Sequence, residues 1–261
     1  MPELSVLTLV LLVAAADLVG RVRHPRRLAG GARRPAQTWS FYLGLLAVLV
    51  ALEGPLDHAA ETSQSWHMAQ HVVLLAIAAP LLVFGAPVRR LAWMLPADWE
   101  SRLRRNRVLR TVSGATPALV ATAVIVQTTV LAAWHLPGPY QAAIRNPLVH
   151  VLEHLALLGA GVLLWWALLH ASRAQLGMGV VALFIAALPG TALGLLMTVA
   201  RTVWYPVYGT GPSALGDQQL AGVVMWAVGN TIYLIAAVAL FAAWLSSLER
   251  STPARPASMR S

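Results

Sequence analysis

The sequence predicts an all-α integral membrane protein, a bundle of seven transmembrane helices with its N-terminus outside and its C-terminus in the cytoplasm. Three observations lead to this fold class. Of the 261 residues, 58% are hydrophobic and 11% are charged, and the mean hydropathy is +0.66, which lies outside the usual composition of soluble domains. Apolar runs long enough to cross a bilayer recur along the chain. The basic residues, all of them arginine, cluster between these runs as they do in cytoplasmic loops.

Each predicted span is an apolar run bounded by polar residues, glycine or proline. Together the runs form one transmembrane domain, residues 1–245. The remaining residues, 246–261, are rich in Ser, Pro, Ala and Arg and are predicted to form a flexible cytoplasmic tail. The seven predicted spans are residues 4–19, 39–56, 67–88, 117–136, 150–170, 178–200 and 219–245.

The first two runs are oriented by the arginines between them. No basic residue precedes residues 4–19, unlike in a secretory signal peptide, so the N-terminus is expected outside. Residues 20–38 contain six arginines and are the first cytoplasmic signal. The run 39–56 then returns to the outer side, where residues 57–66 are expected to form a short polar loop.

The later runs continue this alternation. Residues 67–88 contain Pro80 and Gly85, which a packed membrane helix tolerates. The next seven arginines fall within residues 89–110, where the stretch WMLPADWESRL is expected to form a short interfacial helix. The complete assignment puts 17 arginines inside and two, Arg145 and Arg201, outside, which predicts the N-out, C-in orientation.

The three predicted outer loops share a weak internal repeat. Gly54-Pro55 precedes HMAQH, Gly138-Pro139 precedes HVLEH, and Gly211-Pro212 precedes DQQ. The pattern indicates three related helix hairpins added to a first helix.

Five histidines are predicted to lie at one depth near the outer surface. HMAQH and HVLEH each place two histidines four residues apart, on one face of a helix. Because the chain has no cysteine, a bound metal must be held by His, Met or a carboxylate. Histidines that snorkel to water or bond between helices would give the same pattern. The candidate metal ligands are His67, His71, His135, His150 and His154.

Other polar residues on this side are candidates for supporting a metal or admitting it. Gln70 and Glu153 each follow the first histidine of a pair by three residues and lie on its face of the helix. Asp57 and His58 are expected in a loop, where they could receive an ion. Met68 beside His67 supplies a thioether, with Asp217 as a further carboxylate.

The residues alone leave several functions open. HVLEH fits the H-x-x-E-H pattern of inverted zinc peptidases, which suggests a membrane zinc hydrolase. Paired histidines also bind haem between helices, and a copper permease would place ligands at the same depth. A nucleic-acid partner is not expected: the net charge of +9 is explained by topology, and the partner of this charge is the lipid bilayer.

Three stretches carry a resemblance to a known family. They are SWHMAQHVVLLAIAAPLLVFGAP, AAWHLPGPYQAAIRNPLVHVLEHLALLGAGVLLWW and DQQLAGVVMW. The two histidine doublets, the PLL-x-x-G-x-P ending and the W-H-x-P-x-x-Y loop occur in this order. In these features the chain resembles the polytopic CtaG family of cytochrome c oxidase assembly factors, over spans three to five and the start of span seven.

The resemblance implies a multi-pass protein of the bacterial cytoplasmic (inner) membrane that is not an enzyme. It implies copper, held by the five outer histidines and delivered to the catalytic subunit of a haem-copper oxidase during its assembly. The Cu(I) state is expected from the thioethers of Met68, Met197 and Met225, if they face the site. An upstream copper donor is then required, and a homo-oligomer stays open. Zinc and haem are the alternative occupants of the same histidines.

Overall fold

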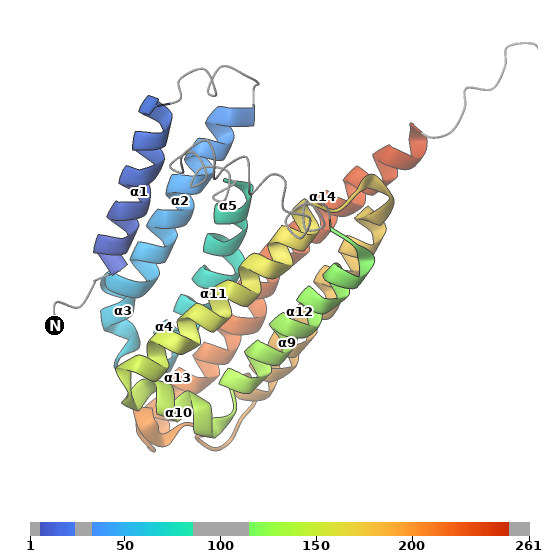
Figure 1. Cartoon of the computed structure of the whole chain (residues 1–261). Helices are drawn as coiled ribbons and strands as arrows, with labels where there is room; N and C mark the ends of the chain where they lie inside the picture. Colours follow the sequence, from blue (N-terminus) through green and yellow to red (C-terminus); the bar gives the residue numbers. More distant parts are fainter. Residues whose placement is uncertain (1–5, 24–32, 86–114, 251–261) are drawn as a thin grey trace, which may run out of the picture.

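The computed structural model describes residues 6–23, 33–85 and 115–250, and the regular elements of this part of the chain are all helices (Figure 1). In chain order they are α1 (Val6–Arg23), α2 (Arg33–Glu53), α3 (Pro55–Ala60), α4 (Gln64–Val72), η2 (Val73–Ala78), α5 (Ala79–Phe84), α9 (Pro117–Trp134), α10 (Pro137–Arg145), α11 (Pro147–Leu169), η3 (Arg173–Gln175), α12 (Leu176–Thr198), η4 (Pro206–Tyr208), α13 (Pro212–Val223), η5 (Val224–Gly229) and α14 (Asn230–Glu249).

Within the described residues, six helical stretches are long and apolar enough to cross a membrane. They are Pro35–Ala60, Gln64–Phe84, Pro117–Trp134, Pro147–Leu169, Arg173–Thr198 and Pro212–Glu249. The remaining predicted span corresponds to α1, whose apolar part, Val6–Gly20, is shorter than the other six. The helical architecture therefore fits a multi-pass membrane protein with six candidate spans, whereas the count of seven and the N-out orientation stay predictions.

Prolines that were expected in loops instead begin helices, and this corrects two predicted loops. Pro55 opens α3, so residues 57–60 of the predicted polar loop are helical and residues 61–63 alone join α3 to α4. Pro212 opens α13, which therefore begins seven residues before the predicted seventh span. The physical reason is that proline has no N–H to lose in a first turn and its fixed φ already suits a helix.

The structure describes only the start of the predicted C-terminal tail and none of the basic segment, residues 89–110. Helix α14 continues to Glu249, so the helix extends four residues beyond the predicted start of the tail, whose flexibility stays a prediction. Residues 251–261 lie outside the described residues. The predicted interfacial helix and the arginines of residues 89–110 also lie outside them.

The short helices gather at one end of the bundle. Figure 1 shows α10 and the start of α13 together at the end where α4 begins, with α3 at the foot of α2. Helix α1 packs against α2, and the backbone N–H of Leu7 donates to the Glu53 carboxylate, which ties the start of α1 to the end of α2. The histidine pairs of α4 and α11 therefore face the interior at this end.

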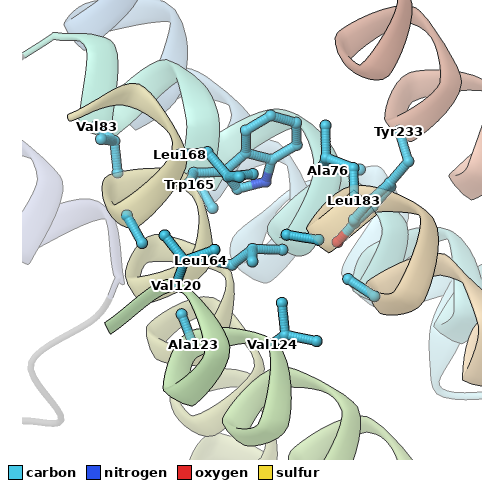
Figure 2. Close-up of a cluster of buried hydrophobic side chains, with 14 of the residues drawn as sticks. Ala76, Val83, Val120, Ala123, Val124, Leu164, Trp165, Leu168, Leu183 and Tyr233 are labelled. Atoms are coloured by element: carbon cyan, nitrogen blue, oxygen red, sulfur yellow. The ribbon is translucent and has the colours of Figure 1, made fainter. Parts of the chain in front are cut away.

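The apolar core is built from the end of α4 and from η2, α5, α9, α11, α12 and α14 (Figure 2). Leu164 and Trp165 are buried at its centre, against Val120 and Val124. The indole Nε1 of Trp165 donates to the backbone oxygen of Leu75 at 2.9 Å. That oxygen lies in η2, which is π-helical, as is η5, which packs against α4. Trp165 of the core thus donates a hydrogen bond to the π-helical stretch that follows HMAQH.

We expect the close approach of α12 and α13 to depend on glycine. A Cβ atom on Gly222 would lie 2.5 Å from the oxygen of Gly194 and 2.7 Å from the nitrogen of Thr198. Gly222→Ala should therefore lower the stability of the purified protein by about 1–3 kcal/mol, measured as thermal unfolding in detergent. Gly216→Ala is the matched control in the same helix, where an added Cβ meets no atom within 4 Å. Equal stability of the two variants would contradict this packing.

Candidate metal centre

The two histidine pairs and His135 converge, although they come from three separate helices. His67 and His71 lie one turn apart on α4, and His150 and His154 lie one turn apart on α11. The ring centroids of His67 and His150 are 5.2 Å apart, and those of His71 and His135 are 5.4 Å apart. His150 is half-buried and the other four are buried. The convergence predicted from spacing and topology is therefore observed.

Glu153 lies among the histidines and is fully buried. Its Oε2 is 3.4 Å from Nε2 of His67, and its Oε1 is 3.6 Å from Nε2 of His71. One ligand atom from each of His67, His150, Glu153 and His154 lies within 4.8 Å of the others. We call these four residues the His3Glu cluster. The carboxylate thus lies among three imidazoles, close enough for small side-chain shifts to bring all four groups to one ion.

The polar atoms of this cluster fit a cation. Hydrogen-bond partners within the described part of the chain are lacking for both oxygens of Glu153, both nitrogens of His67 and Nε2 of His150 and His154. A buried polar atom without a partner costs about 1–3 kcal/mol, so this concentration of them requires compensation. Imidazole nitrogen with carboxylate oxygen is a donor set suited to copper, zinc, iron and nickel.

Asp217 fixes the helix that carries HMAQH. Its carboxylate accepts hydrogen bonds from the backbone N–H of Gln64 at 2.6 Å and of Ser65 at 3.3 Å. It also accepts from the hydroxyls of Ser63 at 3.0 Å and Ser65 at 2.5 Å. The first N–H groups of a helix have no partner within it, and a carboxylate there also meets the positive end of the helix dipole. Asp217, predicted to support or admit a metal, thus caps α4 from α13.

Gln70 and Asp57 do not belong to the His3Glu cluster but form hydrogen bonds that hold α4 in place. The Gln70 amide donates to the oxygen of Ala51 at 2.7 Å and to Oδ1 of Asp57 at 2.8 Å. These bonds join α4 to α2 and α3. His58 is exposed and its Nδ1 lies 3.9 Å from Glu61. The structure therefore places Asp57 and His58 in helix α3, not in the predicted loop, and His58 outside the cluster.

Two tyrosines that the sequence did not single out pack on the histidines. The ring of Tyr140, from α10, lies 5.2 Å from that of His67. Tyr205 lies 4.1 Å from Tyr140 and its hydroxyl donates to the backbone oxygen of His135 at 2.6 Å. Burial raises the pKa of both phenols well above its ordinary value, so both stay neutral. Tyr140 is the last residue of the W-H-x-P-x-x-Y motif, so the motif could have marked it as a site residue. Tyr205 belongs to no motif.

The comparison with protein families supplies one match. The family model described as cytochrome c oxidase caa3 assembly factor matches residues 16–247. This range contains every histidine of the cluster as well as Glu153, Asp217 and both tyrosines. Searches of curated proteins and of solved structures gave no match. The family resemblance inferred from the motifs is thereby confirmed.

The cap on α4 predicts a selective loss of stability. Asp217→Ala would leave the N–H groups of Gln64 and Ser65 without this acceptor, so we expect a loss of about 1–3 kcal/mol in thermal unfolding of the metal-free protein. Glu61→Ala removes an exposed carboxylate nearby and should change stability by less than about 0.5 kcal/mol. A loss of the same size in both variants would show that general charge, and not the cap, is responsible.

Proposed function

The chain belongs to the cytochrome c oxidase caa3 assembly factor family, and on this premise we propose that it binds copper at the His3Glu cluster and delivers it to the oxidase. Membership implies association with the oxidase during assembly. The proposed cargo is copper. It is received from an upstream donor, held among the buried imidazoles and passed to the copper centre of the catalytic subunit. No bond in a substrate is broken.

The main support for this proposal is that four metal-ligating side chains place a ligand atom close to one another. Three imidazoles and one carboxylate, with ligand atoms within 4.8 Å of one another, offer a complete set for one ion. The cluster lies on α4 and the first turns of α11, at the end of the bundle where the short helices gather (Figure 1), and Tyr140 packs on His67. A donor site that must also release its ion needs a ligand that can be reached from outside the bundle, and half-buried His150 is the most accessible of the four.

The topology proposed for the protein follows from the arginine distribution. We place the end that holds α10 on the outer side of a bacterial cytoplasmic membrane, because the opposite choice would export most of the arginines. The start of α1 lies at the same end, as an outward N-terminus requires. The copper position would then be reached from outside the cytoplasm.

The alternatives from the sequence are less well supported. A zinc hydrolase needs a general base that water and a substrate can reach, yet Glu153 is fully buried. Haem would need two imidazoles that point at one porphyrin plane from opposite sides. The rings of His67 and His150 instead stack at 5.2 Å with 23° between their planes. Both observations favour a small ion held by several donors.

The proposal predicts that copper affinity depends on Glu153. Glu153→Gln keeps the shape of the side chain but removes its charge and one oxygen donor, so we expect the Cu(I) affinity of the purified full-length protein to fall at least about ten-fold. Anaerobic competition with a chromophoric Cu(I) chelator measures this change. His58→Ala is the control, since it removes an exposed imidazole outside the cluster. An unchanged affinity in Glu153→Gln and in a variant with His67, His150 and His154 all replaced by Ala would refute the copper site.

The same preparations separate the other functions. A Soret band in the protein as isolated would assign the histidines to haem. Zinc-dependent peptide cleavage that is lost in Glu153→Gln would assign them to a hydrolase. Copper uptake into sealed vesicles, with no effect on the copper content of the oxidase in cells, would assign them to a permease.

A further inference from the structure

Met68 and His135 face each other at the inner edge of the histidine group. Nε2 of His135 lies 3.4 Å from Sδ of Met68, and both side chains are buried. The other ring nitrogen, Nδ1, lies 2.7 Å from the backbone oxygen of Leu131. A carbonyl oxygen can only accept a hydrogen bond, so Nδ1 carries the proton and Nε2 of the neutral imidazole carries a lone pair.

This arrangement directs two acceptors at each other. A thioether sulfur has lone pairs and no proton to donate, and the hydrogen bond at Nδ1 leaves Nε2 as the lone-pair nitrogen of the neutral imidazole. With bonds of about 2.0–2.1 Å to nitrogen and about 2.3 Å to sulfur, one ion would hold its two ligand atoms about 3.3–3.6 Å apart at angles near 100–110°. The observed separation of 3.4 Å lies within this range. The hydrogen bond to Leu131 orients the ring, as a hydrogen bond at the other ring nitrogen does for metal-bound histidines.

We propose that Nε2 of His135 and Sδ of Met68 form a second copper position, specific for Cu(I), next to the His3Glu cluster. The inference rests on the proposed copper function and adds to it a site of different chemistry. Thioether sulfur is a soft ligand that prefers Cu(I), whereas imidazole with carboxylate also accepts Zn(II) and Cu(II).

The space around this pair supports a metal position. Met68, His71 and His135 line a cavity of about 40 Å³, and Met225 on η5 offers it a second thioether. This volume admits at least a water molecule or an ion. The cavity continues past Gln127 and Asn230, so polar groups from other helices extend it below the histidines.

His71 lies between the two positions. Its Nε2 is 3.6 Å from Glu153 of the His3Glu cluster, while its ring is 5.4 Å from that of His135. It also borders the cavity. An ion that leaves the His3Glu cluster would therefore meet the imidazole of His71 on its way to His135 and Met68. Copper can pass between the two positions by exchange of ligands.

X-ray absorption at the copper edge tests the second position, because the chain has no cysteine and any sulfur scatterer must be a methionine. The full-length protein in detergent is loaded anaerobically with Cu(I). We expect two Cu(I) per chain and a copper–sulfur component. Met68→Leu, a volume-conserving change, should remove the sulfur component and lower the content to one. Met197→Leu replaces a methionine buried in the same apolar cluster but outside the cavity lining, and should change neither.

The outcomes distinguish failure of the second position from failure of the copper function. Wild-type protein with Cu(I) bound by nitrogen and oxygen alone overturns the second position and leaves the cluster proposal intact. Retention of both the sulfur component and two Cu(I) in Met68→Leu overturns it as well. Wild-type protein that binds no Cu(I) overturns both proposals. Zn(II) loading of Met68→Leu to the wild-type level shows that the variant keeps the cluster folded.

Discussion

A carboxylate buried among imidazoles is the constraint on which the rest of this structure depends. Glu153 is fully enclosed, and its oxygens face His67 and His71 without a hydrogen bond. An uncompensated charge in such a place costs several kcal/mol, so the site requires a proton or a metal cation. The surrounding helices are tied together accordingly, by the Asp217 cap on α4, by the Gln70 amide on α2 and by the Tyr205 hydroxyl at the end of α9.

The sequence predicted the parts of the fold and site that depend on local periodicity. Spacing of four residues puts two histidines on one helix face, and alternating apolar runs put HMAQH and HVLEH at the same depth. The short helices α3 and α10 were missed because Gly-Pro pairs were interpreted as loop residues, although proline also suits a first helical turn. Copper itself was named by family resemblance, since imidazole spacing does not distinguish it from zinc.

Contacts between distant parts of the chain escaped prediction. Asp217 and Gln70 looked like residues near a metal, but each bonds to backbone groups of another helix, which no single-sequence pattern specifies. We did not predict polar groups deeper in the bundle than His71, because the helix that carries His71 continues as the apolar run LLAIAAPLLVF. They come instead from α9 and α14, where Gln127 donates to Tyr233 and both border the cavity.

The π-helical stretch η2 has a consequence for how one helix serves two environments. Each residue of an α-helix turns by about 100°, so one extra residue within a turn changes the angular phase of everything that follows. The residues before η2 present imidazoles to the His3Glu cluster, and those within and after it present Ala76, Ala79 and Val83 to the apolar core. Deletion of one residue within Val73–Ala78 would restore a regular phase and rotate one of these faces out of place. The irregular turn thus lies where the helix passes from the imidazoles of its outer end to the apolar packing of its inner end, and helix α11 contacts both parts.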